Sequence, residues 1–187
     1  MKKLALFAIA ASAVIATPAM AQSVTGTITL NGNVASKCSV TSSPAGATFA
    51  QTVNFGELAQ ANGTLRTGLD TDFTAAAVQA TVVCNTGTPK VSVDANPMTT
   101  GAGTLSGYAN TINYTANVAV STVTPGTVNF SNATTAAPLA ATAVGAALAN
   151  SANNVKVTTS GYTTPGATDI LSAGAYTGNI IIVISPT

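Results

Sequence analysis

The chain has 187 residues, of which 47% are hydrophobic and only 6% are charged, and its formal net charge is +1. This length fits about one domain and is enough to bury a hydrophobic core. The sparse charge forms no basic patch, which argues against nucleic acid and anionic membranes as partners. The chain has no histidine, so the commonest general base is missing, and we expect neither an enzyme nor a cofactor.

Residues 1–21 have the features of an export signal. Lys2 and Lys3 precede the apolar stretch "LALFAIAASAVIA", and the small residues of "AMA" end at Ala21. The stretch is shorter than the roughly 20 apolar residues that a membrane span needs, which disfavours an uncleaved anchor. We therefore expect cleavage before Gln22, which would remove two of the six cations and leave a net charge of −1.

Residues 22–34 alternate between apolar or small side chains and polar ones. Val24, Gly26, Ile28 and Leu30 share one face, with threonines between them, as in a β-strand. Two interpretations fit this pattern. The segment is either the first strand of a hairpin that turns at "NGN", or an extended arm that serves another protein.

The two cysteines, Cys38 and Cys84, predict one disulfide bond, because an exported chain meets an oxidising environment. A metal pair and a reactive thiol are the alternatives. Neither cysteine lies in a CxxC motif and no histidine accompanies them, which disfavours both. On the chain-entropy account, closing a loop of about 45 residues contributes roughly 4 kcal/mol of stability.

Short strand-like runs separated by turn residues dominate the rest of the chain and predict an all-β sandwich. The expected strands are 24–31, 33–41, 51–56, 76–84, 89–95, 111–120, 126–130, 154–160 and 176–184. We interpret "LDTDF", with Asp70 and Asp72, as solvated acids on a turn or strand edge rather than a catalytic or calcium pair. The alanine-rich residues 132–154 are interpreted as a surface loop, with a short helix over 139–149 as the alternative.

The expected last strand is apolar on both faces. Tyr176, Gly178, Ile180, Ile182 and Ile184 point one way, and Ile181 and Val183 point the other. This pattern predicts a buried strand. An uncovered edge of such composition favours aggregation, so we expect another strand beside it.

An ordered set of motifs resembles a known family. The set is "SVTG" at the start of the expected mature chain, then "ASKCSV", "VNFGEL", "VQATVVCNTGTPKVSVDA" and "GAYTGNIIIVI". It resembles the spore coat protein U-like family, which includes subunits of the archaic (Csu-type) chaperone–usher pili. The resemblance covers residues 22–95 and 174–184.

The resemblance implies an incomplete immunoglobulin-like β-sandwich, the pilin fold, over 35–187, with an N-terminal donor-strand arm over 22–34. The arm of one subunit would complete the sandwich of the next by strand addition. Its plugs would be Val24, Gly26, Ile28 and Leu30. The groove-edge strand, which a chaperone would also recognise, would present Tyr176, Ile180, Ile182 and Ile184.

The implied function is a structural subunit of a surface pilus, or fimbria, that supports adhesion and biofilm formation. The implied partners are copies of the chain or related pilins, a periplasmic chaperone and an outer-membrane usher, in a Gram-negative bacterium that exports the chain to its surface. A secreted adhesin or carbohydrate-binding sandwich and a spore-coat-like matrix protein remain alternatives. The sequence leaves open whether the arm is donated or folds back in the monomer.

Overall fold

The computed structural model describes residues 25–41, 48–124 and 126–186. The chain divides into two units, Met1–Val34 and Ala35–Thr187. The described part contains one helix and eleven strands, and all but one of the strand pairs are antiparallel. The expected all-β class is therefore confirmed.

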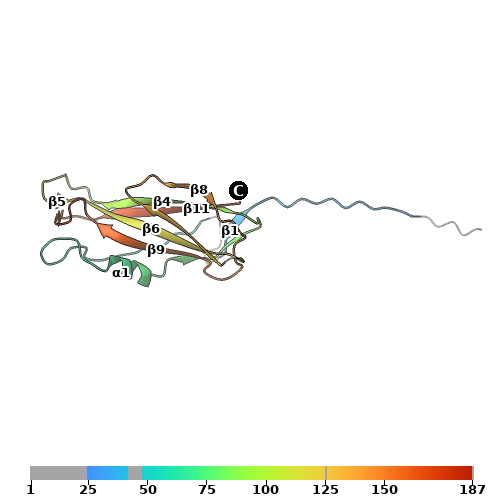
Figure 1. Ribbon diagram of the computed structural model, residues 1–187, viewed down its shortest axis with the longest axis horizontal. Coiled ribbons are helices and arrows are strands. Elements are labelled where there is room, and N and C mark those ends of the chain that lie inside the picture. The colour runs from blue at the N-terminus through green and yellow to red at the C-terminus, as the bar shows by residue number, and fades with distance from the viewer. Residues whose placement is uncertain (1–24, 42–47, 125, 187) are drawn as a thin grey trace, which may run out of the picture. The chain divides into compact units, whose positions relative to one another are not determined.

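The second unit contains every helix and strand of the described residues (Figure 1). The first half of the unit holds β1 (Cys38–Val40), α1 (Leu69–Ala75), β2 (Gln79–Ala80), β3 (Val82–Cys84), β4 (Lys90–Thr99) and β5 (Tyr108–Ala109). The second half holds β6 (Thr111–Ser121), β7 (Thr127–Ala133), β8 (Leu139–Ala143), β9 (Val155–Thr163), β10 (Ile170–Leu171) and β11 (Thr177–Ser185).

Seven of the strands form one hydrogen-bonded sheet in the order β11–β4–β6–β9–β2, with β7 beside β6 and β8 beside β4. The link between β4 and β6 is narrow, because only Met98–Thr99 pair with Thr111–Ile112. The sheet therefore has two parts, β11–β4–β8 and β7–β6–β9–β2. The helix α1 packs against β9.

The two parts of the sheet share one hydrophobic core. In both β4 and β6, alternate side chains are buried, as expected for strands with one face turned to a core. The fully buried side chains include Val91 and Val93 of β4, Ile112 and Val118 of β6, and Val155 of β9. All belong to a single cluster, so the two parts face each other across it.

Two buried asparagines pair backbone groups that the strands leave free. The Asn154 side chain accepts a hydrogen bond from Val82 N (2.8 Å) and donates to the carbonyls of Val82 (2.6 Å) and Ala149 (2.7 Å). Asn132 accepts from Ala95 N (2.9 Å) and donates to Ala137 O (2.7 Å). Since buried polar groups are costly without partners, these amides tie loops and short strands to the core.

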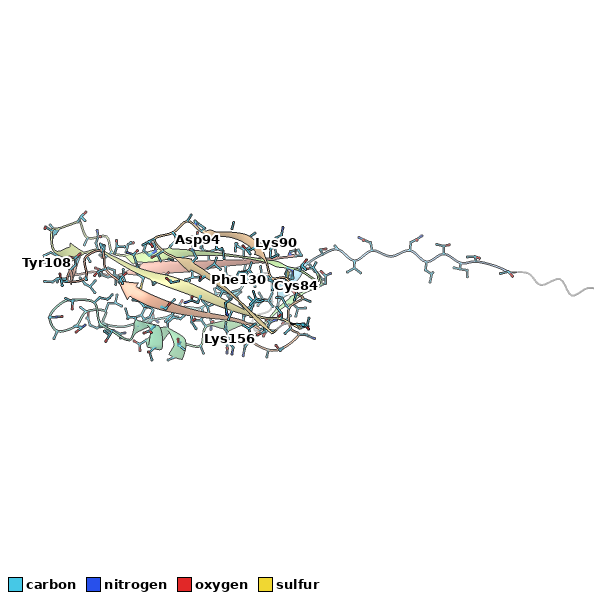
Figure 2. The ribbon with its side chains drawn as sticks, viewed as in Figure 1. Cys84, Lys90, Asp94, Tyr108, Phe130 and Lys156 are labelled. Carbon is cyan, nitrogen blue, oxygen red and sulfur yellow. A yellow bond between two sulfur atoms is a disulfide. The ribbon has the colours of Figure 1, made fainter. Side chains whose placement is uncertain are left out.

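The expected disulfide is confirmed. Cys38 and Cys84 are bonded and face each other in the antiparallel pair β1–β3. Figure 2 places Cys84 at one end of the second unit and Tyr108 at the opposite end. At the Tyr108 end, β5 pairs in parallel with β10.

Several sequence predictions are corrected. Residues 25–31 form no strand, the expected strand 33–41 shrinks to β1, and 51–56 form none, because these segments find no partner strand among the described residues. The segment around Asp70 and Asp72 is the helix α1, whose two apolar residues bury one face. Residues 139–143, expected as a loop or helix, form β8 because they pair with β4.

The largest correction concerns β11, which was expected to be buried. It pairs only with β4 among the described residues and is an edge strand. Ile181 and Val183 on its outer face are 48% and 51% exposed. Ile180, Ile182 and Ile184 face the core but stay only partly buried.

We expect Asn154→Ala to lower the free energy of unfolding by about 2–4 kcal/mol, because it leaves the buried N–H and C=O of Val82 without partners. Asn117→Ala is the matched control, since that amide bonds only Ser160 Oγ on an exposed face. The control should change stability by less than about 0.5 kcal/mol. Urea unfolding of both variants measures the difference, and equal losses would contradict the role given to Asn154.

Candidate functional site

The free edge of β11 borders a long groove in the second unit. In an antiparallel strand, alternate backbone N–H and C=O groups point to each side, and only the β4 side of β11 is paired. Across the groove from β11 lie residues 48–59, which have no strand assignment from 48 to 58. Two stretches of backbone therefore flank a space that no strand of the described residues fills.

Three overlapping hollows make up this groove. The Cys38 hollow, of about 400 Å³, lies between Cys38–Val40 and Ile181–Ile184. The central hollow, of about 450 Å³, lies between Phe49–Phe55 and Tyr176–Ile180. The Tyr176 hollow, of about 670 Å³, lies between Val53–Ala59 and Leu171–Tyr176. Neighbouring hollows share lining residues and so adjoin one another along β11, and the three together are called the groove.

The two walls of the groove run in opposite directions. From Cys38 to Ala59 the first wall passes the Cys38, central and Tyr176 hollows in that order, whereas from Leu171 to Ile184 the second wall passes them in reverse. The groove consequently has two distinct ends. One lies beside Cys38 and Ile184, and the other lies beside Ala59 and Leu171.

Aromatic side chains make the floor of the central hollow. The rings of Tyr114 and Tyr162 stack at 5.5 Å, and Phe55 meets Tyr162 edge-on at 5.8 Å and Phe73 at 6.4 Å. Phe49 and Val53 add apolar surface. Tyr114 and Phe73 belong to the buried core, and the other floor residues are partly buried against it. The floor is thus the side of the core that borders the groove.

Tyr114 also fixes β11 from below. Its hydroxyl donates to the carbonyl of Asn96 (2.8 Å) or Asn179 (3.0 Å), on β4 and β11. Burial raises the pKa of the Tyr114 phenol, with a smaller contribution from Tyr162 and Asp94. Burial likewise raises the pKa of Tyr162. A neutral Tyr114 phenol can donate to these carbonyl oxygens, whereas the Tyr162 hydroxyl shares a hydrogen bond with Thr159 Oγ1 (2.7 Å).

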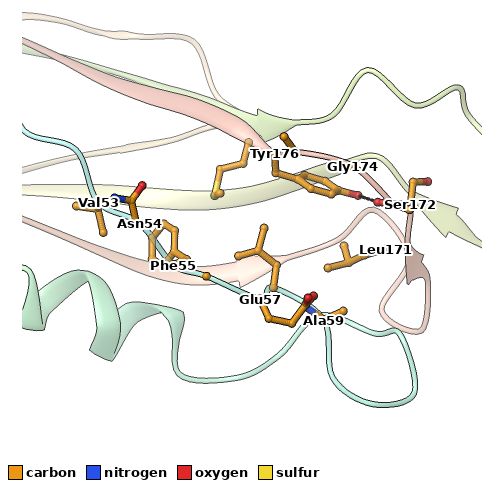
Figure 3. A pocket seen from close by; sticks show the side chains of 14 residues that line it. Val53, Asn54, Phe55, Glu57, Ala59, Leu171, Ser172, Gly174 and Tyr176 are labelled. Carbon is orange, nitrogen blue, oxygen red and sulfur yellow. Dashed lines mark hydrogen bonds between the residues drawn. The ribbon is translucent and has the colours of Figure 1, made fainter.

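Arg66 holds the wall opposite β11. Its guanidinium donates to Glu57 O (2.6 Å) and Phe55 O (2.9 Å), and it forms an ion pair with Asp72 of α1 at 2.5 Å. These contacts tie the backbone of the wall to the helix (Figure 3 shows Phe55 and Glu57 of this wall). The extended segment therefore keeps its place without strand pairing.

At the other end of the same wall, Asn85 fixes the residues that lead into the arm. Its side chain accepts a hydrogen bond from Lys37 N (2.7 Å) and donates to Ala35 O (2.8 Å), and its backbone N–H donates to Lys37 O (3.1 Å). These bonds continue the β1–β3 pairing beyond the disulfide. Residues Ala35–Lys37 thus extend the line of β1 past the Cys38 end of the groove.

Apolar side chains are exposed in the described residues of the first unit. Its described residues, 25–34, form no helix or strand. Ile28, Leu30 and Val34 are 87%, 90% and 81% exposed. Gly26 has no atom within 4 Å of the position that a Cβ would take. Val24, the remaining expected plug, lies outside the described residues.

All four expected groove-edge residues line the groove. Tyr176, Ile180 and Ile182 line the central hollow, and Ile184 lines the Cys38 hollow. Tyr176 also donates its hydroxyl to Ala109 O (2.6 Å) or Ser172 O (3.1 Å), and burial raises its pKa. The sequence analysis quoted "VNFGEL", residues 53–58, as a motif but did not assign it to the opposite wall, and it missed the aromatic floor, which joins residues far apart in the chain.

Other candidate sites are weak in the described residues. Within these ranges, no group of three or more histidine, cysteine, aspartate or glutamate side chains is placed to hold a metal ion. No helix of the described part is long and apolar enough to cross a membrane. Asp72 contacts Arg66, and Asp70 lies in the first turn of α1.

We expect the free energy of unfolding to fall as pH rises above about 10, the ordinary pKa of tyrosine. The unfolded chain then loses phenolic protons that folded Tyr114 keeps, so high pH favours unfolding. Tyr114→Phe should reduce this fall, whereas Tyr108→Phe, at an exposed position, should follow the wild type. Urea unfolding at pH 8 and pH 11 measures the fall in the free energy of unfolding. An identical fall in the wild type and both variants would contradict the role given to Tyr114.

We expect Arg66→Met to lower the free energy of unfolding by roughly 1–3 kcal/mol, since charged donors to backbone carbonyls contribute about that much. Amide exchange should become faster in residues 55–60, the wall that Arg66 holds. Lys156→Met, at an exposed lysine of β9, is the control and should leave that segment unchanged. Unaltered exchange in Arg66→Met would show that the wall stands without this contact.

Comparisons with protein-family models, with curated proteins and with solved structures find no match to this chain. The function is therefore inferred from the groove, its two walls and the exposed apolar residues of the first unit. These features belong to the chain's own sequence and geometry.

Proposed function

We propose that this chain is the structural subunit of a surface fibre, and that residues 22–34 of one copy fill the groove of the next. The main supporting observation is that one chain contains both parts of such a contact, a groove and an arm that could bind in it. The groove is lined by apolar side chains of the core and its rim beside the free edge of β11, and residues 25–34 expose aliphatic side chains in an unpaired segment. Strand addition joins such halves, with main-chain hydrogen bonds and side-chain pockets.

The position of the arm favours an open chain of copies over a closed pair. Each arm leaves its own second unit beside Cys38, where Asn85 keeps Ala35–Lys37 in line with β1. A neighbour's arm that enters from the Ala59 end runs antiparallel to β11 and brings the two copies head to tail. Such a heterologous contact repeats without closing and builds a filament.

The energy available is adequate for a stable contact. Burying Ile28 and Leu30 contributes on the order of 3–6 kcal/mol, from about 1.5–3 kcal/mol for each side chain. Pairing along β11 adds main-chain hydrogen bonds, and ordering the arm offsets part of the gain. In this proposal the filled groove completes an immunoglobulin-like sandwich of the pilin type.

The proposal includes the partners that the sequence resemblance implies. A subunit of the archaic chaperone–usher kind needs a periplasmic chaperone to cover its groove before assembly, and an outer-membrane usher at which arms replace chaperones. The unpaired edge of β11, with Ile181 and Val183 about half exposed, gives a physical reason for such a helper, since uncovered apolar surface and free strand edges favour aggregation. Adhesion and biofilm formation would then be properties of the assembled fibre.

We expect Ile28→Ser with Leu30→Ser to abolish polymers, because the double change removes the main apolar contribution of the arm. Thr27→Ser with Thr29→Ser changes the other face of the arm and is the matched control, which should polymerise like the wild type. Surface material is run on denaturing gels with and without boiling. A ladder that collapses to monomer only on boiling indicates strand-exchanged polymers.

A second arm-based variant separates folding from assembly. Deletion of residues 22–31 should yield a monomer that keeps its groove. When intact subunits are added, the arm of an intact subunit should bind in that groove. If the deletion variant, or the Ile28→Ser/Leu30→Ser variant, still formed boiling-sensitive ladders like the wild type, the proposal would be wrong.

A further inference from the structure

Side-chain size varies in complementary ways along the arm and along β11. From the Cys38 end of the groove, the inward positions of β11 are Ile184, Ile182, Ile180 and Gly178. Gly178 lines the central hollow and adds no side chain to it, and a Cβ here would come within 2.9 Å of Pro97 O, so no larger residue fits this position. Along the arm the corresponding face carries Val24, Gly26, Ile28 and Leu30.

Resting on the proposed function, we propose one register for the contact between copies. The arm of one copy lies antiparallel to β11 of the next copy. In this register Gly26 lies beside Ile182, Ile28 lies beside Ile180, and Leu30 lies beside Gly178. Gly26 of the arm then lies beside the large side chain of Ile182. Leu30, a large plug, lies beside Gly178, which has no side chain. Val24 lies beside Ile184 at the Cys38 end.

The neighbouring registers fit less well. Moving the arm two residues toward the Ala59 end would set Leu30 against Tyr176 and leave Gln22 beside Ile184, which crowds one end and buries a polar side chain at the other. Moving it two residues the other way sets Gly32 against Gly178 and leaves a void. A one-residue shift turns the threonines into the core.

The same register gives a role to residues beyond Leu30. Gly32 passes Tyr176, and Val34 reaches the Tyr176 hollow, the largest of the three at about 670 Å³. Val34 is 81% exposed in its own copy. The contact therefore extends over the whole groove. Val34, the last residue on the same face of the arm, fills the end of the groove beside Ala59 and Leu171.

Disulfide trapping between outward-facing residues tests the register. In it Thr27 of one copy lies directly beside Ile181 of the next, with Cβ atoms about 5 Å apart, while diagonal neighbours lie about 7–8 Å apart. Full-length chains carry Thr27→Cys together with Ile181→Cys, Asn179→Cys, Val183→Cys or Thr177→Cys. Polymers are assembled with the native disulfide formed, oxidised, boiled without reductant and run on gels.

We expect the Thr27→Cys/Ile181→Cys polymers to retain at least about tenfold more boiling-resistant ladder than the other pairs, since disulfides need close Cβ atoms. Preferred trapping with Asn179→Cys, Val183→Cys or Thr177→Cys would overturn the register, although the proposed function would survive. Absence of any boiling-sensitive polymer from the wild type would overturn both.

A pair of compensating changes in side-chain size tests the register independently of disulfide trapping. Gly26→Leu should slow polymer formation by roughly tenfold or more, because the new side chain collides with Ile182. Adding Ile182→Ala in the same chain should restore the rate to within about threefold of the Ile182→Ala variant alone. Rescue by Ile180→Ala or Ile184→Ala instead would overturn the register.

Discussion

The unpaired outer edge of β11 is the constraint on which the remaining features depend. Backbone N–H and C=O groups need partners, and a core needs cover on every side. β11 satisfies only the side that faces β4 among the described residues. The half-buried isoleucines of β11, the extended wall of residues 48–59 and the aromatic floor all border this one vacancy. Figure 1 shows β11 and β4 lying together in the second unit.

The rest of the second unit keeps this vacancy open rather than collapsing into it. Arg66 and Asp72 hold the far wall against α1, and Tyr114 holds Asn179 of β11 and Asn96 of β4 from the core side. The disulfide fixes β1 at the Cys38 end. These contacts act at separate points along the groove, so its shape does not depend on an occupant at any single place.

Strong local patterns made part of this structure predictable from the sequence. Apolar and polar residues tend to alternate in Lys90–Thr99, Thr111–Ser121 and Thr177–Ser185. This alternation indicates strands because successive side chains of a strand point to opposite faces of the sheet. Two cysteines in a chain with the features of an export signal sufficed to predict the disulfide. The same alternation placed Tyr176, Ile180, Ile182 and Ile184 on one face of β11, whereas their role at a groove edge came only from the family resemblance.

Features that depend on distant partners were not predictable in this way. The helix α1 has only Leu69 and Phe73 as apolar signals over seven residues. β8 is built from small, mostly exposed residues that become a strand only through β4. The stacking of Tyr114 on Tyr162 joins β6 and β9, which lie far apart in the chain. The burial of β11 was overestimated because its composition is that of a central strand while its position is at an edge.

The hydrogen bonds of Asn85 have a mechanical consequence. In a fibre of the proposed kind, tension along the axis would pass from each arm through Ala35–Lys37 into Cys38. At that point the covalent bond to Cys84 transmits the load to β3. The arm itself, lying parallel to the pull, would be loaded in shear, so many hydrogen bonds would have to break together. A stretched fibre would then resist rupture better than the strength of any one contact suggests.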